Sequence, residues 1–262
     1  MGTRLRVRLI YMKPTGHLHP LSHIIRDINA VFAELGFVFA DGPEMESTKY
    51  NFDMLNVPKD HPSRDMQDTF YVERTDPLGE EVVMRTHTSP VQVRYMERFM
   101  KERAEGKGDF PIRVIVPGKV FRNEATDATH EAQFYQLEGL MVDKGISVGH
   151  LKGTLEYFFA KIFGGNVEVR LRPSFFPFVE PGLEVDMRLT GDSAPAKLKD
   201  RWVEIMGGGM VHPSVLRGAG IDPDVYQGFA FGMGIDRLAV MRYGVDDVRL
   251  FYNGDLRVVS QF

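Results

Sequence analysis

Hydrophobic residues recur at helical spacing near the amino-terminal end of the chain. They lie three or four positions apart over Leu21–Leu35, and Gly36 follows them. This spacing places them on one face of a helix, and glycine is common just past a helix end. We therefore expect an amphipathic helix here, followed by a strand that begins at Phe37. The alternating stretch Leu5–Tyr11 indicates a short strand before the helix.

Two further helices and several strands follow from the same kind of pattern. Ser89 and Pro90 are typical of a helix start, with the serine as N-cap and the proline at the first helical position. Ser147 precedes an apolar helical stripe that ends before Gly164. Strand patterns occupy residues 82–86, 112–116, 167–171 and 202–206, and Pro117 with Gly118 indicates a turn or a bulge. The polar stretch Ser47–Arg74 shows no regular period, which is usual for a functional or mobile segment.

The stretch Val120–Glu138 predicts two strands joined by a polar loop. Residues two apart on a strand share a face, so Arg122 points with Glu124 and Gln136 points with Glu138. If the strands pair, one face carries an arginine, two carboxylates and an amide. Buried charges need partners, so this face is either a floor that binds a charged ligand or a solvated face of an edge hairpin. The spacing leaves both interpretations open.

The stretch Pro173–Asp186 also departs from any regular period. Three phenylalanines lie among its prolines: Phe175, Phe176 and Phe178. They form either a hydrophobic plug between elements or an aromatic wall for a flat ligand. Glu184 and Asp186 lie two residues apart on a strand, which suits Mg²⁺ held together with phosphates and suits a salt-bridged surface equally well.

Glycines accompany the last strands. Gly207–Gly209 lets the backbone approach another group closely. Gly228–Gly234 alternates small and apolar residues and then starts a helix, in whose first turn Arg237 lies. A positive charge at a helix amino terminus is locally unfavourable, and an external anion would remove that penalty.

The composition narrows the class of protein. The 262 residues are 43% hydrophobic and 26% charged, which is ordinary for a globular protein, and the net charge is −4. A protein that grips nucleic acid by bulk charge would be basic, so any RNA contact needs a local patch. No cysteine, no apolar run of membrane-spanning length, no signal peptide, no Walker loop and no Rossmann fingerprint is present. We expect a cytosolic protein with no membrane partner.

Several of these stretches resemble one family. F-R-x-E, the loop T-D-x-T-H and F-x-Q-x-E are similar to motif 2 of class II aminoacyl-tRNA synthetases, and most similar to the bacterial phenylalanyl-tRNA synthetase alpha-subunit family. The first helix with its Gly-Phe and Pro43 resembles motif 1. Gly-x-Gly-x-acid-Arg resembles motif 3, with Asp236 where many relatives have Glu. The segments T-H-T-S-P and F-P-F-x-E-P-x-x-E-V-D also resemble sequences typical of this family, and the resemblance runs from His19 to Phe262.

The resemblance implies an α+β fold, a mostly antiparallel sheet flanked by helices. It assigns residues 19–262 to the catalytic domain and leaves residues 1–18 as an amino-terminal linker or strand. Motif 1 implies a homodimer interface, and the family's alpha subunit also works with a beta subunit, a different chain. We expect a catalytic module without the family's amino-terminal coiled-coil arm, because no long charged heptad helix is present.

The implied activity is ATP-dependent activation of L-phenylalanine to phenylalanyl-adenylate, with Mg²⁺, followed by transfer to tRNA(Phe). For ATP, the resemblance places Arg122 and Arg237 on the phosphates as the catalytic residues, Glu124 on the adenine amino group, Phe134 against the adenine and His130 at the outer phosphates. For the amino acid, it implies contacts from His87, Ser89, Gln92, Gln136, Glu138, Phe176, Phe178, Ala230 and Gly232. It makes Glu184 and Asp186 the candidate Mg²⁺ ligands.

Two other functions are compatible with parts of this picture. One is a synthetase-derived interaction or regulatory module without catalytic activity. The presence of all the motif arginines and carboxylates argues against it. The other is a class II synthetase for another amino acid. The aromatic wall and the small residues at 230 and 232 disfavour a polar or small substrate.

Overall fold

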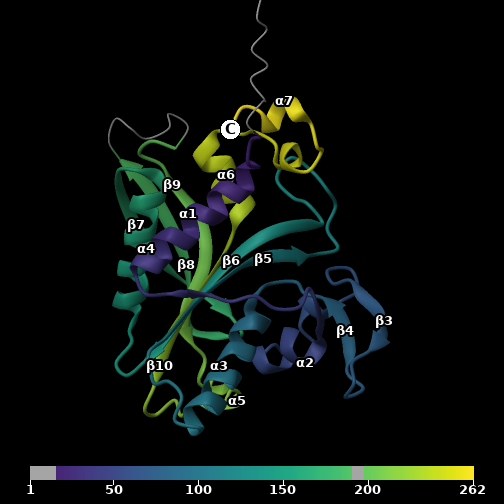
Figure 1. Cartoon of the computed structure of the whole chain (residues 1–262), viewed down its shortest axis with the longest axis vertical. Helices are drawn as coiled ribbons and strands as arrows, with labels where there is room; N and C mark the ends of the chain where they lie inside the picture. The colour runs from purple at the N-terminus through teal and green to yellow at the C-terminus, as the bar shows by residue number, and fades with distance from the viewer. Residues whose placement is uncertain (1–15, 191–197) are drawn as a thin grey trace, which may run out of the picture.

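A seven-stranded sheet forms the centre of the molecule (Figure 1). The computed structural model describes residues 16–190 and 198–262, so the predicted strand Leu5–Tyr11 lies outside the described residues. The strand order is β1 (Val38–Phe39), β5 (Ile112–Phe121), β6 (Gln133–Asp143), β10 (Gln227–Gly234), β9 (Trp202–Val211), β8 (Val179–Thr190) and β7 (Asn166–Phe176). Of these strands only β1 and β5 pair in parallel over the described residues, which confirms the mostly antiparallel α+β fold.

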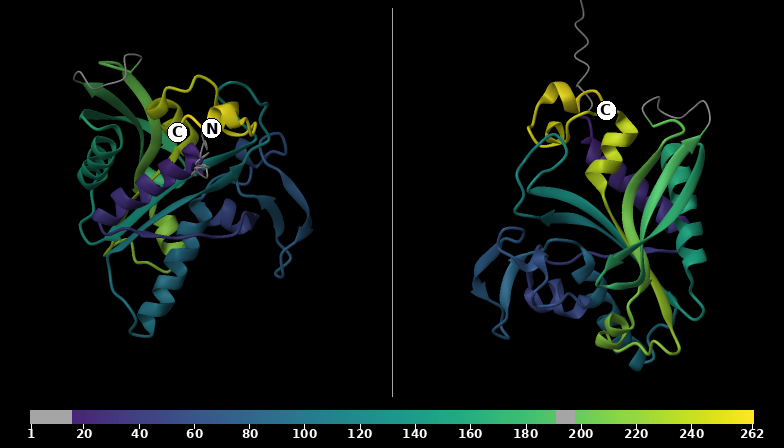
Figure 2. Two further views of the ribbon diagram at one scale, coloured as in Figure 1. Left: turned by 45° about the horizontal axis from the view of Figure 1, so that its top comes forward. Right: turned by 180° about the vertical axis from the view of Figure 1, so that it is seen from behind.

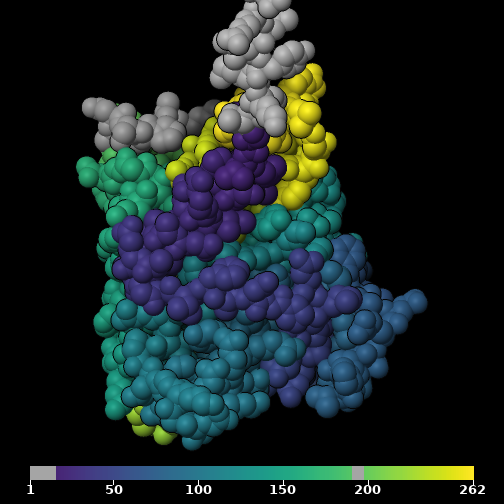
Figure 3. Space-filling model, in the orientation of Figure 1, coloured from purple at the N-terminus to yellow at the C-terminus, as the bar shows by residue number. Residues whose placement is uncertain are grey.

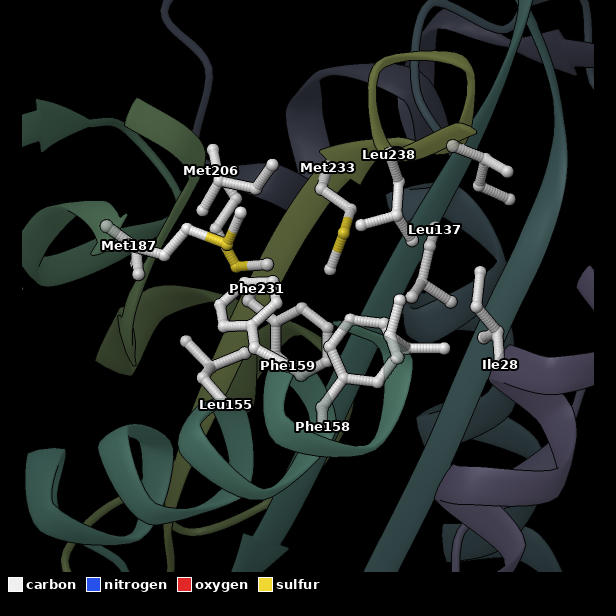
Figure 4. Close-up of a cluster of buried hydrophobic side chains, with 14 of the residues drawn as sticks. Ile28, Leu137, Leu155, Phe158, Phe159, Met187, Met206, Phe231, Met233 and Leu238 are labelled. Carbon is white, nitrogen blue, oxygen red and sulfur yellow. The ribbon is translucent and has the colours of Figure 1, made fainter. Parts of the chain in front are cut away.

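Three helices of the described chain cover one face of this sheet, as the views in Figure 2 show. They are α1 (Pro20–Glu34), α4 (Val148–Phe163) and α6 (Ile235–Tyr243). Figure 4 shows Phe158 and Phe159 of α4 packed beneath Phe231 and Met233 of β10. Full burial of one such aromatic or aliphatic side chain contributes about 1.5–3 kcal/mol, so this layer is a main source of stability.

The opposite face carries a second, smaller core. It packs against α3 (Ser89–Ala104), α5 (Pro213–Gly218) and the 3₁₀ turn η1 (Asp53–Leu55). A small antiparallel sheet stands beside it, made of β2 (Met45–Ser47), β4 (Glu81–Met84) and β3 (Tyr71–Thr75), with α2 (Thr48–Asn51) and η2 (Pro62–Arg64) between its strands. Two short elements, η3 (Val248–Phe251) and α7 (Leu256–Val259), follow α6.

Strand alternation decides which side chains face each layer. On β10, Phe229, Phe231 and Met233 enter the helix-covered core, so Ala230 and Gly232 face the opposite side. The same rule holds on β6, where Leu137 enters that core while Gln136 and Glu138 face the opposite side. The polar floor expected from Val120–Glu138 therefore forms on the second face of the sheet.

Most predicted elements are confirmed, and four boundaries differ. The first helix ends at Glu34, and Gly36 has a positive φ of 76°, as predicted. The N-cap of α3 is Thr88, because the Ser89 side chain is engaged elsewhere. β5 continues through Pro117, since β1 pairs only with Val114 and Ile115 and no neighbour needs the missing N–H.

The other two differences concern Gly207–Gly209, which lies inside β9, and the polar stretch 47–74, which contains short helices and strands. None of the helices in residues 16–190 and 198–262 combines the length and apolarity needed to cross a membrane.

Candidate active site

A cavity of about 560 Å³ opens on the second face of the sheet. Its floor comes from β6, β9 and β10, and one wall comes from the start of α3. The turn between β7 and β8 and the segment after α2 complete it. Of the candidate substrate residues, it is lined by His87, Ser89, Gln92, Arg122, Glu124, Gln136, Glu138, Phe176, Phe178, Ala230 and Gly232.

Two glycines make part of the floor bare backbone. Gly232 lies between Glu138 and Gly207 in the sheet register, so all three project from the same face. A Cβ at position 232 would lie 3.1 Å from both the Gln136 amide nitrogen and Cγ of Glu138. A Cβ at position 207 would lie 2.8 Å from Cζ of Phe176. Side chains at these positions would occupy the space that the cavity now leaves for a ligand.

Glu138 is a buried carboxyl at the centre of this floor, with 4% of its surface exposed. Ser89 Oγ donates to its Oε2 at 2.5 Å, and Gln92 Nε2 donates to the same oxygen at 3.1 Å. Burial raises the pKa of Glu138 to about 7, although these donors and the nearby Arg122 favour the carboxylate. Both side-chain donors use Oε2, and the Thr88 backbone N–H also donates to this carboxyl. An ionised carboxylate has about four lone-pair sites, so one acceptor position remains for a ligand.

Two more acceptors in this region have no partner within the described part of the chain. They are Oε1 of Gln136 and Nδ1 of His87, both on residues that line the cavity. His87 Nε2 lies 3.0 Å from the Asn51 carbonyl and must donate to it, so Nδ1 holds the lone pair. Burial lowers the pKa of His87 to about 3, so this imidazole is neutral. A set of acceptors around Glu138 suits a ligand group that only donates, such as an ammonium.

An apolar slot continues from this polar centre. The Phe178 ring lies between those of His87 and Phe176, with centroid distances of 6.3 and 6.0 Å. Further apolar lining includes Val93, Met96, Leu140, Val179, Val211, Val215 and Ala230. Phe175 also lines the cavity but is 80% exposed, whereas Phe176 and Phe178 are half-buried in its wall.

Arg122 supplies the cation of the site. It follows β5, and its Nε donates to the Thr86 carbonyl at 3.1 Å. Its guanidinium lies over the Phe134 ring at 5.1 Å and is 4.0 Å from Glu124. Burial lowers the pKa of Arg122, but an arginine remains charged. A weakly paired cation at a cavity wall is a suitable contact for a phosphate or a carboxylate.

The other predicted ATP residues lie at the same end of the sheet but do not line the cavity. Arg237 is exposed in the first turn of α6, and the structure shows no hydrogen bond or ion pair for it within residues 16–190 and 198–262. His130 lies on the exposed loop after β5, where its Nδ1 is 3.1 Å from Asp127. Phe134 is half-buried under Arg122.

The acidic residue of the motif 3 pattern has a structural role. Asp236 is buried and accepts from the Tyr135 backbone N–H at 2.7 Å and from the Tyr252 hydroxyl. Burial raises the pKa of Asp236 to about 6. The first bond ties the start of α6 to β6, and the second ties it to the residue that follows η3. Together they fix the helix start on which Arg237 lies.

The predicted Mg²⁺ ligands Glu184 and Asp186 are engaged by arginines. Both oxygens of Asp186 accept from Arg172, and Oδ2 also accepts from Arg170 at 2.8 Å. Arg172 pairs with Glu184 at 2.8 Å, and hydrogen bonds from Arg172 and Arg170 lower the pKa of Asp186. No group of three His, Asp or Glu side chains in the described part of the chain could hold a metal. The salt-bridged alternative therefore describes this pair, and the metal prediction does not fit.

The polar stretch 47–74, which the sequence marks as functional or mobile, supplies another wall of the cavity. Phe52, Leu55, Val57 and Asp68 line the cavity, and all lie in the irregular stretch 47–74. Asn51 is fully buried and bonds to Thr86 through its side-chain amide. The aperiodic polar sequence marked the stretch as functional or mobile but assigned no role to these individual residues.

Comparison with known proteins decides the family. The model of the family tRNA synthetases class II core domain (F) matches residues 7–262. The chain belongs to this family. Phenylalanine--tRNA ligase alpha subunit of Bacillus subtilis (strain 168) is 52% identical over 250 residues, which cover 94% of this chain and 69% of that protein. The protein of the same name from Dehalococcoides mccartyi (strain CBDB1) is 50% identical over 253 residues, covering 95% and 70%.

A solved structure supports the fold. Pyrrolysyl-tRNA synthetase from Desulfitobacterium hafniense superposes with a TM-score of 0.66 over 90% of this chain and 74% of that one, at 17% identity. At this identity the likeness concerns the architecture alone. The chain is therefore an ATP-using aminoacyl-tRNA ligase of class II by family, with the class II synthetase fold.

Proposed function

We propose that this chain activates L-phenylalanine with ATP to phenylalanyl-adenylate and then transfers the phenylalanyl group to tRNA(Phe). The two relatives with about 50% identity are both phenylalanine--tRNA ligase alpha subunits. We further propose that residues 19–262 form the catalytic domain. One observation carries the substrate assignment. The hydrogen-bond acceptors around Glu138 lie next to an apolar slot that has Phe178 in its wall.

The amino acid is oriented by its two ends. Its ammonium donates to the Glu138 carboxylate and to Gln136 Oε1, and His87, Ser89 and Gln92 complete the surroundings of that group. Its benzyl ring enters the slot between Phe176, Phe178 and Ala230. This placement directs the carboxylate toward Arg122, where ATP binds. Because its ammonium and its ring are both held, the reacting carboxylate stays in place, and this positioning is the main source of rate acceleration in such a step.

The first step is an in-line displacement at phosphorus. A carboxylate oxygen of phenylalanine attacks the α-phosphorus of ATP, the new P–O bond forms, and the bond to the pyrophosphate oxygen breaks. No covalent protein group takes part. Arg122 stabilises the negative charge on the phosphoryl oxygens, which is the form of electrostatic catalysis expected in phosphoryl transfer. In the second step, a tRNA hydroxyl attacks the acyl carbon and AMP leaves.

The remaining ATP contacts are proposed from the motifs and their placement. Glu124 beside Arg122 accepts from the adenine amino group, and Phe134 stacks on the base. Arg237 and His130 hold the outer phosphates at the exposed end of the floor. The exposed position of Arg237 at a helix amino terminus supports this role, because an anion there meets both the cation and the helix dipole.

Mg²⁺ is proposed to arrive bound to the phosphates of ATP. Mg²⁺ retains several waters and is commonly held by substrate phosphates with few protein carboxylates. The arginine pairs of Glu184 and Asp186 leave no open carboxylate cage at that position of β8. No catalytic step is therefore assigned to a protein-held metal.

Assembly is proposed through the motif 1 region and with a beta subunit. Figure 3 shows the segment after α1 running across the surface of the molecule. There Val38 and Phe39 of the edge strand β1 are 48% and 55% exposed. An exposed apolar edge strand is a common site for pairing with another chain.

Amino-acid-dependent pyrophosphate exchange with a panel of amino acids tests the proposal. Phenylalanine should support the fastest exchange, with tyrosine misused because an apolar pocket rejects an added hydroxyl only about 100-fold. Exchange led by another amino acid would refute the substrate. Exchange with none of them would favour a regulatory module over an enzyme.

A further inference from the structure

The aromatic wall of the cavity is carried by a very short turn. β7 ends at Phe176, β8 begins at Val179, and Pro177 and Phe178 form the connection. On one side this turn is held by the sheet, where the His212 N–H donates to the Phe178 carbonyl at 2.9 Å. Its other side faces the segment after α2. The position of Phe178 in the slot therefore depends on what holds that second side.

An asparagine side chain makes this connection. Asn56 Nδ2 donates to the Pro177 carbonyl at 2.7 Å, across 121 positions of sequence. Leu55 and Val57 on either side of it line the cavity, whereas Asn56 does not. Its side chain is thus directed to the turn while its neighbours form the opposite wall of the cavity.

The backbone at this position is specialised for that direction. Asn56 has φ 58° and ψ 22°, a left-handed conformation that asparagine tolerates better than most residues. The segment itself is firmly anchored: Arg64 donates to Asp53 at 2.6 Å and to the Val57 carbonyl at 2.5 Å, and its guanidinium lies over the Phe52 ring. The asparagine therefore connects a fixed segment to a turn.

We propose that Asn56 is a specificity-determining positioning residue that holds the Phe176–Phe178 turn at the distance required by the substrate ring. This inference rests on the proposed function for the identity of that ring. Without the amide, the turn keeps its sheet contacts and the ring contacts of Phe178 with His87 and Phe176 but loses its tie to the segment after α2, so Phe178 gains freedom to move away from the slot. Affinity for the ring then falls, and rejection of larger rings weakens. The ATP end of the site, at Arg122, keeps its own contacts.

The decisive variant is Asn56→Gly, because glycine adopts the same positive φ without strain and removes the side chain that carries the amide. We expect the KM and the Kd for L-phenylalanine to rise about fivefold, the effect of one lost hydrogen bond. The KM for ATP should stay unchanged, and the ratio of tyrosine to phenylalanine exchange should increase. Asn56→Asp keeps the side-chain shape but places a carboxylate against the carbonyl, so it should raise the phenylalanine KM at least as much.

The matched control is Asn166→Ala, which removes an exposed asparagine at the far end of β7. It should leave all of these constants unchanged. Thermal unfolding of each variant reports whether it is folded, and calorimetric binding of L-phenylalanine gives the affinity without turnover. An Asn56→Gly variant with wild-type phenylalanine affinity would overturn the proposal, as would an equal rise in both KM values.

Failure of the proposed function gives a different result. Wild-type protein would then show no exchange with phenylalanine, or stronger exchange with another amino acid. In the second case the same variants are measured with that amino acid, and a selective rise in its KM still supports the positioning role. If the wild-type protein shows no exchange with phenylalanine or with any other amino acid, the positioning role of Asn56 is refuted together with the proposed function.

Discussion

Protonation of Glu138 should control the binding of the amino acid. The pKa of this carboxyl is raised to about 7 by burial, and the ammonium of the substrate binds its ionised form. The apparent Kd then increases by a factor of one plus the ratio of protonated to ionised carboxyl. That factor is about 1.1 at pH 8 and about 11 at pH 6, so affinity for L-phenylalanine should fall about tenfold between them.

The groups around Glu138 do not titrate in this range. Arg85 and Arg122 remain charged, and the pKa of His87 is lowered to about 3, so its imidazole stays neutral. The variant Glu138→Gln should bind L-phenylalanine at pH 8 about 10- to 100-fold more weakly, because a hydrogen bond to a charged group is lost. Its affinity should be independent of pH between 6 and 8. Calorimetric titration of both proteins at four pH values measures this.

The same substitution should alter stability with a defined sign. A folded-state pKa above the ordinary value of 4.5 means that the folded protein binds the proton more tightly than the unfolded chain. The favourable contribution is complete below pH 4.5 and is lost as the pH rises through 7, by about 3 kcal/mol. Glu138→Gln lacks this loss, so its stability relative to wild type should increase between pH 5 and pH 8 in urea unfolding. A wild-type phenylalanine affinity that is the same at pH 6 and pH 8 would refute the reasoning.

Three further predictions concern other parts of the site. Arg122→Ala should lower pyrophosphate exchange by at least about 100-fold, about 3 kcal/mol of transition-state stabilisation, and an unchanged rate would exclude its proposed role. Gly207→Ala should displace the Phe176 ring, which lies 2.8 Å from the added Cβ, and should raise the phenylalanine KM without changing the ATP KM. Ala230→Gly should admit para-substituted phenylalanines, measured as exchange with para-chlorophenylalanine. No gain there would show that residue 230 does not limit the slot.

Local patterns predicted a large part of this molecule because their information is local. The helical spacing of α1, the alternation of β10 and the glycine after α1 each report a backbone conformation that neighbouring residues impose. The alternation along β6 and β10 also predicted which side chains share a face. Most of the cavity floor could therefore be anticipated from the spacing of the motifs alone.

Long-range partners were beyond that kind of reasoning. Ser89 looked like a helix cap, but its hydroxyl donates to a carboxyl that lies 49 positions later. The sequence left Asp186 as either a metal ligand or part of a salt-bridged surface, and strand pairing of β7 with β8 brings Arg170 and Arg172 onto it. Asn56 carried no signal, because its partner is a backbone carbonyl 121 positions away.

The hydrophobic periodicity and the family motifs predicted the class II fold, and they named the groups that are proposed to face the substrate. Folding decided which of those groups are free to act. Burial raised the pKa of Glu138 to about 7 and left Gln136 Oε1 without a partner in the described part of the chain. By contrast, the carboxylate of Asp186 is paired with arginines, which lower its pKa. The physical reason is that the solvation and charge partners of a side chain depend on segments distant in the chain, which only the assembled sheets bring together.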